Sequence, residues 1–400
     1  MSGLILTLNA GSSSLKFALY EPRAGGEPEL ILAGQAERLG GEARFIARYP
    51  AGDTVADHPF GAGTPANHHG ALAEILRVVE SERPGAEMAA VGHRVVHGAH
   101  LYGEPVEVTD AIIASLREFE PFAPLHQPHN IAGILAAKAA FPGAIEIACF
   151  DTAFHRAHPF VNDVFALPRR YYDKGVRRYG FHGLSYTFIA DHLSKTMPDL
   201  HAGKVVVAHL GNGASMCAIK GGQSIGSSMG FSAMDGLPMG TRCGQLDPGV
   251  VLYLMEHEGL TTKEVTDVLY RQSGLLGLSG LSNDMRTLQE AGTQAAKEAI
   301  DYFVFRIRRE LGAMAAVLSG LDGLVFTGGI GEHDADIRAR VCADGGWLGL
   351  AVDEAANARG ERVISTADSA VTVMAIPTDE ERVIARAAQG FLQSAGLSAA

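Results

Sequence analysis

The groups best suited to hold a phosphate lie in three turns rich in small residues, each directly after a stretch that predicts a buried strand. They run from Asn9 to Lys16, from His209 to Ser215 and from Gly328 to Glu332. Small residues let backbone N–H groups approach a phosphate, and Lys16 adds positive charge. The first turn lacks the Walker A spacing and is equally well explained as a hairpin with incidental serines. Together, the three turns predict a nucleotide held between two domains.

Two arginines stand in settings that favour function over packing. Arg242 lies between glycines in the stretch Met239–Gly244, and Arg94 lies in the stretch Gly92–His100. A guanidinium group forms paired hydrogen bonds with phosphate or carboxylate groups. We therefore predict that both arginines bind an anionic group.

The stretch around Arg94 also holds His93, His97 and His100, which raises the question of a metal site. On a strand, the first two would share a face while the third would lie on the opposite one. No carboxylate or thiol stands nearby in the sequence. Histidines that fill strand and loop positions are the better interpretation.

An acidic residue and a basic loop follow further along the chain. Asp151 comes directly after the predicted strand Ile145–Phe150, and active sites of α/β proteins lie at such strand ends. A helix N-cap is an equally common role for aspartate. The loop that ends in His182 begins with Arg177 and Arg178, which are either functional or a solvated surface pair.

The predicted elements repeat one pattern about half a chain apart. A strand at residues 4–8, a small-residue turn and a strand at residues 15–20 return as strands at residues 205–210 and 216–219. This repetition predicts two similar α/β halves. Other strands are expected at residues 30–32, 44–48, 88–96, 145–150, 224–228, 323–327 and 372–376, and helices at residues 69–79 and 298–318.

The C-terminal helix has a start signal of its own. Pro377 is followed by Thr378, which predicts the N-cap, and Glu381 stands three residues later, as in a capping box. We therefore expect the final helix to begin next to Thr378.

Composition narrows the class of protein. The 400 residues carry a formal net charge of −12, which argues against broad binding to nucleic acid or to an anionic membrane. The apolar run near the N-terminus is too short for a signal peptide, and no apolar stretch reaches the length of a membrane span. The cysteines (Cys149, Cys217, Cys243 and Cys342) are scattered, which fits a reducing compartment. A cytoplasmic protein is expected.

Taken together, these blocks resemble the acetate kinase family, and the match runs from Asn9 to Arg386. The resemblance rests on nine ordered motifs: NAGSSSLK (9–16), GHRVVHG (92–98), APLH (123–126), FDTAFH (150–155), RRYGFHG (177–183), HLGNGAS (209–215), MGTRCG (239–244), GGIGE (328–332) and PTDEE (377–381). It implies the fold of sugar kinases, actin and the heat-shock ATPases, with two related α/β domains that flank a nucleotide cleft. We expect residues 1–149 with the helix 383–400 to form one domain and residues 150–382 the other.

The resemblance implies reversible transfer of the γ-phosphoryl group of ATP to acetate, which gives acetyl phosphate and ADP. It implies that His182 and Arg242 stabilise the transferred group, that Arg94 and Lys16 contact the substrate, and that Asp151 is essential. Acetate is ionised above a pKa of roughly 4–5 and needs no general base. We therefore assign Asp151 to orienting Arg94 or Arg242.

The resemblance also implies the remaining ligands and partners. Mg²⁺, or Mn²⁺ in its place, would bind Asn9 and Glu380, which requires the C-terminal helix to fold back onto the N-terminal domain. A homodimer is expected. ATP or ADP would be bound by His209, Leu210, Gly211, Asn212 and Gly213, by Asp284, Met285 and Arg286, and by Gly329, Ile330, Gly331, Glu332 and His333.

Five positions depart from the commonest pattern of the family. Leu184 and Tyr186 follow the FHG motif, His333 lies at the edge of the adenosine loop, and Asp379 precedes the magnesium glutamate. Ala233 replaces a proline in the acyl-pocket segment, which bears on the length of the acyl chain that fits.

Two alternatives to an acetate kinase are considered. A propionate or butyrate kinase of the same fold would differ in an acyl pocket built from Val96, Leu125, Phe181 and Ala233. A nucleotide switch without catalysis, as in actin or the chaperones, would not need Arg94, Arg242 and His182.

Overall fold

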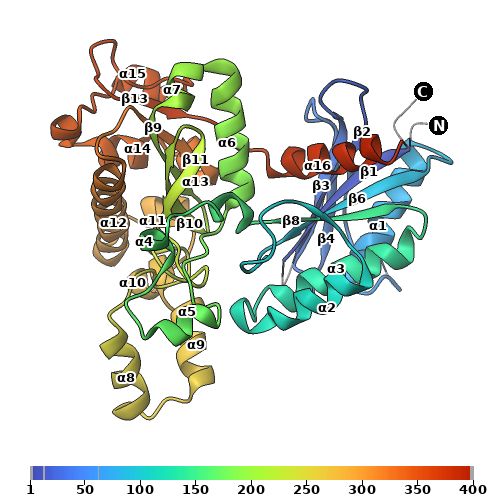
Figure 1. The fold of residues 1–400 in the computed structure, drawn as a ribbon, viewed down its shortest axis with the longest axis horizontal. Coiled ribbons are helices and arrows are strands. Elements are labelled where there is room, and N and C mark those ends of the chain that lie inside the picture. Colours follow the sequence, from blue (N-terminus) through green and yellow to red (C-terminus); the bar gives the residue numbers. More distant parts are fainter. Residues whose placement is uncertain (1–2, 12–13, 62, 397–400) are drawn as a thin grey trace. The chain divides into compact units, whose positions relative to one another are not determined.

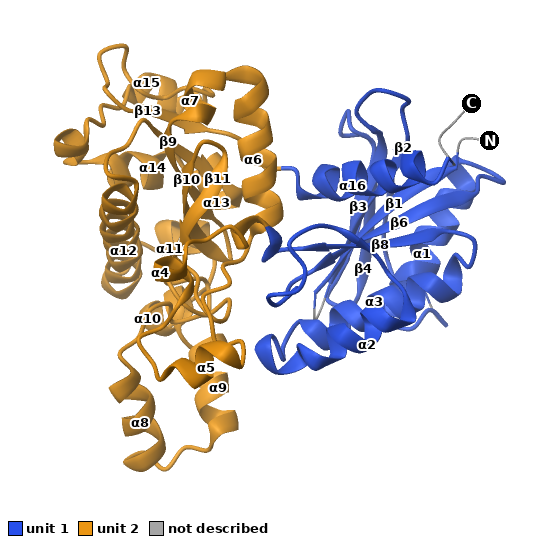
Figure 2. Ribbon diagram, viewed as in Figure 1, with its two compact units in different colours: residues 1–153, 379–400 blue, residues 154–378 orange. Residues whose placement is uncertain are grey.

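The computed structural model describes residues 3–11, 14–61 and 63–396, so Ser12 and Ser13 of the first turn lie outside the described residues. The chain forms two compact units (Figure 2). Unit 1 comprises residues 1–153 and 379–400, and unit 2 comprises residues 154–378. The chain therefore crosses between the units twice.

Unit 1 is built on a mixed sheet with the strand order β5-β4-β3-β2-β1-β6-β8-β7 (Figure 1). Strands β1 to β5 form an antiparallel meander, while β6 and β8 run parallel to β1. The strands are β1 (Leu4–Ala10), β2 (Leu15–Glu21), β3 (Glu29–Glu37), β4 (Arg44–Arg48), β5 (Thr54–Pro59), β6 (Met88–Val95), β7 (Val106–Glu107) and β8 (Ile145–Phe150).

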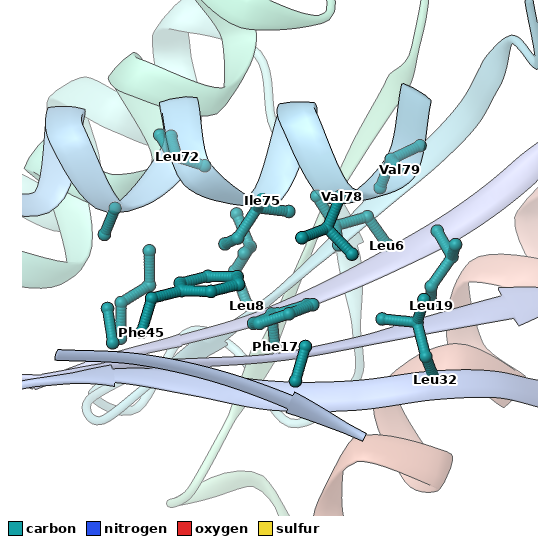
Figure 3. Close-up of a cluster of buried hydrophobic side chains, with 14 of the residues drawn as sticks. Leu6, Leu8, Phe17, Leu19, Leu32, Phe45, Leu72, Ile75, Val78 and Val79 are labelled. Atoms are coloured by element: carbon teal, nitrogen blue, oxygen red, sulfur yellow. The ribbon is translucent and has the colours of Figure 1, made fainter. Parts of the chain in front are cut away.

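Helices cover both faces of this sheet. One face packs on α1 (His68–Glu82), whose Leu72 and Ile75 meet Leu8 and Phe17 in the cluster of Figure 3. The opposite face carries α16 (Glu380–Ser394), because Gly92 of β6 lies against Ile384. The remaining helices of the unit are α2 (Asp110–Glu118), α3 (Gln127–Ala140) and the 3-10 turn Glu120–Phe122.

Unit 2 has a smaller mixed sheet with the order β11-β10-β9-β12-β13. The strands are β9 (Lys204–Leu210), β10 (Ala214–Lys220), β11 (Gln223–Ser227), β12 (Gly323–Thr327) and β13 (Thr372–Ala375). α6 (Gly183–Thr196) packs on one face through Tyr186, Ile189 and Leu193. α12 (Gln294–Leu318) packs against β9, β10 and β11.

The other helices of unit 2 are short. They are α4 (Phe160–Asp163), α5 (Arg169–Asp173), α7 (Pro198–Ala202), α8 (Pro248–Glu256), α9 (Thr262–Arg271), α10 (Gly274–Ser279), α11 (Met285–Ala291), α13 (Gly328–His333), α14 (Ala335–Cys342) and α15 (Glu354–Ala358), with 3-10 turns at Ala153–His155 and Gly345–Leu348. Across the described ranges, none of the helices has both the length and the apolar character needed to cross a bilayer.

The two sheets share one arrangement of strands. In unit 1 the run β3-β2-β1-β6-β8 has an antiparallel meander followed by two strands parallel to β1. In unit 2 the run β11-β10-β9-β12-β13 repeats this order and these directions around β9. The prediction of two related α/β domains is confirmed.

Two local predictions are wrong. Gly328–His333 forms the short helix α13 rather than a turn, because Glu332 and Arg338 satisfy the polar groups at its ends. The final helix begins at Glu380 and is capped by Asp379, whose carboxylate accepts from the N–H of Arg382 at 2.9 Å. Thr378 is not the cap; its own N–H donates to Glu332.

Candidate active site

Arg94 is the centre of the polar cluster in unit 1. Its Nε donates to Oδ1 of Asp151 at 2.9 Å, and its Nη2 donates to Oδ2 at 2.5 Å. Such a paired contact fixes the plane of the guanidinium group. Asp151 is 1% exposed and follows β8, so it is neither a helix cap nor a solvated group.

Asn9 and Glu380 meet at the same arginine, although they lie at opposite ends of the chain. Oδ1 of Asn9 accepts from Nη1 of Arg94 at 3.1 Å, and Oε2 of Glu380 lies 3.8 Å from Nε. Asn9 is near the end of β1 and Glu380 begins α16, which lies against β1 and β6. The fold-back of the C-terminal helix therefore brings an amide oxygen and a carboxylate to one point.

Burial and neighbouring charges shift the pKa values of the groups in this cluster. Burial raises the pKa of Glu380, and Asp151 adds to the rise, while Arg94 and Lys16 oppose it. Burial alone would lower the pKa of Arg94, but Asp151 and Glu380 outweigh it, so that this pKa lies above its ordinary value. Lys16 is exposed on β2, directly opposite Asn9 in the hairpin. The cluster thus keeps a fixed cation next to oxygen ligands.

Unit 2 holds a second polar cluster, around His182. This residue has the left-handed φ of +56°, which costs a non-glycine residue about 1–3 kcal/mol and is typical of functional sites. Its ring stacks on His209, with 4.3 Å between the ring centroids. A Cβ atom on Gly213 would lie 3.2 Å from His182 Nε2 and 2.8 Å from Arg242 Nη2. The imidazole and the guanidinium therefore both reach the space directly above Gly213.

The arginine of this cluster is held by the backbone. Nη1 of Arg242 donates to the carbonyl oxygen of Ala233 at 2.5 Å, and the loop of Gly240 packs against Asn212. A Cβ atom at Gly240 would lie 2.1 Å from Oδ1 of Asn212, so a larger residue there would displace the Asn212 side chain. Gly240 thus lets the loop of Arg242 approach the loop after β9.

His155 supports the backbone next to His182 through a hydrogen bond to the carbonyl oxygen of Phe181. Burial lowers the pKa of His155 to about 3, so its ring is neutral, and its Nε2 lies 3.0 Å from the carbonyl oxygen of Phe181. That carbonyl only accepts, so Nε2 must carry the proton and Nδ1 must accept from Ser224 at 2.8 Å. The motif FDTAFH (150–155) therefore supplies Asp151 to unit 1 and His155 to unit 2.

A pocket of about 540 Å³ opens beside these loops within unit 2. Of the predicted nucleotide residues, those that line it are Gly211, Asn212, Asp284, Met285, Arg286, Gly329, Ile330 and His333. Asn283, Gln289, Asp334 and Ala335 also line it and were not predicted. Two carboxylates that line the pocket cap helices. Asp284 accepts from the N–H of Thr287, which lowers the pKa of Asp284, and Asp334 accepts from the N–H of Ile337.

Other predicted nucleotide residues do not line this pocket. Leu210 and Gly331 are buried, and His209 and Gly213 lie at the His182 cluster. Glu332 turns its carboxylate inward: Oε1 accepts from the N–H of Gly328 at 2.9 Å and from that of Thr378 at 3.1 Å. Glu332 therefore shapes the loop.

The predicted acyl-pocket residues fall in both units. Val96 follows β6, where its N–H donates to Asn130, and Leu125 precedes α3. In unit 2, Phe181 is buried beside His182, and Ala233 supplies the carbonyl that holds Arg242. Each unit thus contains two of the four predicted residues, and Ala233 contacts Arg242 of the unit 2 cluster.

Sequence reasoning left several contributors without a role. The hydroxyl of Ser215 contacts Nδ1 of His182, and that of Ser185 contacts Nδ1 of His209. The hydroxyl of Tyr186 contacts that of Ser215. Arg177 and Arg178 are not a solvated pair, since they lie over the rings of Tyr172 and Phe165. The available signal was the position of Ser215 at the end of the small-residue turn that runs from His209.

Comparison with known proteins identifies the family of the chain. The family model described as "Acetokinase family" matches residues 4–386. An acetate kinase of Methylocella silvestris is 56% identical over 399 residues, which is 96% of this chain and 97% of that protein.

Two crystal structures have the same fold. The acetate kinase of Porphyromonas gingivalis has a TM-score of 0.86 at 37% identity, covering 98% of this chain and 100% of that one. A propionate kinase of Francisella tularensis has a TM-score of 0.88 at 34% identity, covering 96% and 98%. The match extends over both units, and on this ground the chain belongs to the acetokinase family.

Proposed function

We propose that the protein transfers the γ-phosphoryl group of ATP to acetate, reversibly, to give acetyl phosphate and ADP. The observation that carries this proposal is the placement of His182 Nε2 and Arg242 Nη2 over Gly213, next to the pocket lined by the predicted nucleotide loops. Membership of the acetokinase family supports it. Unit 2 is assigned the phosphoryl donor, and unit 1 the acceptor.

The reaction makes one bond and breaks one bond at phosphorus. A carboxylate oxygen of acetate forms the new P–O bond as the bond to the bridging oxygen of ADP breaks, and the electron pair leaves with ADP. Charge spreads over the transferred group, so positive and hydrogen-bonding groups supply most of the rate. Arg242 and His182 are proposed to contact the transferred phosphoryl oxygens, and Arg94 to hold the acetate carboxylate.

Acetate needs no general base, because it is already ionised at neutral pH. Asp151 has both carboxylate oxygens bonded to Arg94, which suits an orienting role rather than proton transfer. Lys16 is proposed to add positive charge on the acceptor side.

The residues of unit 1 fit Mg²⁺. Asn9 and Glu380 bring oxygen ligands to one point beside Arg94, and oxygen is the ligand that Mg²⁺ prefers. Within the described residues, no three histidine, cysteine or acidic side chains form a metal cluster, and Mg²⁺ commonly keeps several waters and uses one or two carboxylates. Bound Mg²⁺ would neutralise phosphate charge.

The acyl preference depends on unit 2 as well. Ala233 is smaller than proline, and one extra methylene in a pocket is worth only about 10- to 200-fold in discrimination. We therefore propose acetate as the main substrate with measurable turnover of propionate. The likeness to a crystallised propionate kinase is in keeping with this second substrate.

We further propose a homodimer formed through unit 2. Helix α8 is apolar but has no buried residue, and Leu252 and Tyr253 are 56% and 51% exposed. A surface of this kind is typical of protein interfaces. The free cysteines fit a reducing compartment, which supports the cytoplasm as the location.

Trapping of the product tests the main proposal. Hydroxylamine converts an acyl phosphate to a coloured hydroxamate, so the purified protein is assayed with ATP, Mg²⁺ and either acetate, propionate or butyrate. We expect acetate to give the highest kcat/KM and Arg242→Ala to abolish most of the signal. Absence of hydroxamate with all three acids would overturn the proposed activity.

A further inference from the structure

Two hydroxyl groups stand in line behind His182. Oγ of Ser215 lies 2.8 Å from Nδ1 of His182, and Oη of Tyr186 lies 2.5 Å from the same Oγ. Tyr186 and Ser215 are fully buried, at 0% exposure. Tyr186 belongs to the first turn of α6 and Ser215 to β10, so two core elements fix this line.

The chemistry of the site sets the direction of these hydrogen bonds. Phosphoryl oxygens accept hydrogen bonds, so an imidazole that stabilises them through Nε2 must carry a proton on Nε2. In the neutral ring Nδ1 is then an acceptor, and Ser215 must donate to it. Ser215 Oγ in turn accepts, and the phenolic O–H of Tyr186 is a suitable donor.

A positive charge near Nε2 favours the neutral ring. Nη2 of Arg242 and Nε2 of His182 both reach the space above Gly213, and a nearby cation disfavours the imidazolium form. In this series of hydrogen bonds, Tyr186 donates to Ser215 and Ser215 donates to Nδ1 of His182. The His182 ring then carries a single proton, on Nε2, which faces the site.

We propose that Tyr186 and Ser215 are positioning residues that hold His182 in its Nε2–H tautomer. The kinetic part of this inference rests on the proposed function, while the tautomer itself does not. The wrong tautomer would turn a lone pair toward the phosphoryl oxygens and remove a donor from the transition state. Neither residue touches a substrate in this scheme.

The tautomer is measured directly in the full-length protein without nucleotide. Histidine labelled with heavy nitrogen gives separate NMR signals for protonated and unprotonated ring nitrogens, and the His182 signals are identified by their loss in His182→Gln. We expect wild-type His182 to carry its proton on Nε2 alone at neutral pH. A proton on Nδ1, alone or together with Nε2, would overturn the proposal without any variant.

Two variants then test the cause. Ser215→Ala removes the donor to Nδ1, so an Nδ1–H form should emerge, and kcat should fall by about 10- to 100-fold, the range for partners that orient functional histidines at metal sites. KM for ATP should change little. Tyr186→Phe should cause a smaller loss of kcat, since Ser215 keeps its hydroxyl.

Each variant has a matched control. Tyr179→Phe removes an equally buried phenol that donates to the carbonyl oxygen of Gly175. Ser228→Ala removes a buried hydroxyl that accepts from the N–H of Met216. We expect both controls to retain kcat and the Nε2–H tautomer. An unchanged tautomer and kcat in Ser215→Ala would refute the positioning role, whereas an inactive wild-type enzyme would refute the proposed function alone.

Discussion

Asp151 accepts hydrogen bonds from Arg94 at both of its carboxylate oxygens, and its side chain is almost fully buried. The two residues therefore act as one unit: the carboxylate fixes the guanidinium group, and the guanidinium group neutralises the carboxylate. Removing Arg94 leaves the buried Asp151 carboxylate without the guanidinium group that pairs with it.

This pairing predicts different outcomes for stability and activity. Arg94→Ala should lower kcat/KM for acetate by roughly 10²-fold, because acetate loses the group proposed to position its carboxylate. It should also cost about 3–5 kcal/mol of unfolding free energy, because the Asp151 carboxylate stays buried without its cation. Adding Asp151→Asn to Arg94→Ala should restore part of the stability and none of the activity. Urea unfolding and the hydroxamate assay measure the two effects. A double variant as unstable as Arg94→Ala would argue against the pairing.

Gly213 tests the convergence of His182 and Arg242. In Gly213→Ala the new methyl group would lie 2.8 Å from Arg242 Nη2, so one of the two side chains must move. We expect kcat to fall by about 10²-fold, because misplacement by about 1 Å can cost that much. Gly346→Ala serves as a control, since nothing lies within 4 Å of a Cβ atom there and its φ is not in the left-handed region. Equal activity of Gly213→Ala and wild type would show that the space above Gly213 is not used.

Glu332 is predicted to shape the nucleotide loop. Glu332→Ala removes the acceptor for the N–H groups of Gly328 and Thr378, so KM for ATP should rise and stability should fall by about 1–3 kcal/mol per bond. Glu332→Gln keeps an amide oxygen and should retain most of the function. Nucleotide titration by calorimetry is the measurement. If Glu332→Gln is as harmful as Glu332→Ala, the negative charge of Glu332 is required. An acceptor oxygen would then not be enough, which would contradict the role in shaping the loop.

Buried histidines predict an acid-sensitive unit 2. Burial lowers the pKa of His155 to about 3 and that of His158 to about 4, below the ordinary value of about 6.5 in the unfolded chain. As the pH falls below that value, the unfolded state gains protons that the folded state does not. Each histidine then costs about 1.4 kcal/mol of unfolding free energy per pH unit. The full stability is present only above about pH 6.5.

His158→Gln checks this directly. Between about pH 7 and about pH 5, its unfolding free energy should fall by about 2 kcal/mol less than that of the wild type. Urea titrations at both pH values give the comparison. Identical pH slopes for the two proteins would mean that His158 is not held neutral.

Ala233→Pro tests the acyl preference, and the structure shows what else it touches. The carbonyl oxygen of Ala233 holds Arg242, so proline can lower turnover of every acid by shifting that contact. A smaller pocket should in addition lower the propionate-to-acetate ratio of kcat/KM, which one methylene changes by about 10-fold or more. A uniform loss for both acids would assign position 233 to Arg242 alone.

The strands were predictable because their signals are local. Ile145–Phe150 and Gly323–Thr327 are apolar runs bounded by turn or loop residues, and the structure has both with the predicted bounds. The sequence of α13 predicts a turn because its glycines disfavour a helix. Glu332 and Arg338 stabilise the helix through contacts that local patterns do not reveal.

The site residues also fall into those with local sequence signals and those that depend on contacts across the fold. Residues such as Arg94 and Arg242 stand out by type and by neighbouring glycines. Partners across the fold do not: Glu146 pairs with His93 from another strand, and Ser215 reaches His182 only after β10 and α6 have packed. Thr378 had a plausible capping pattern, but Asp379 binds the free N–H groups more directly.

The central claim is direct transfer of a phosphoryl group to a carboxylate oxygen, and an isotope measurement tests it most directly. Acetate labelled with heavy oxygen in both carboxylate positions is incubated with ATP, Mg²⁺ and the protein, and the products are analysed by mass spectrometry and phosphorus NMR. We predict ADP, together with acetyl phosphate that keeps both labelled oxygens, one of them bonded to phosphorus. Formation of AMP, an unlabelled oxygen between carbon and phosphorus, or no acetyl phosphate would contradict the account.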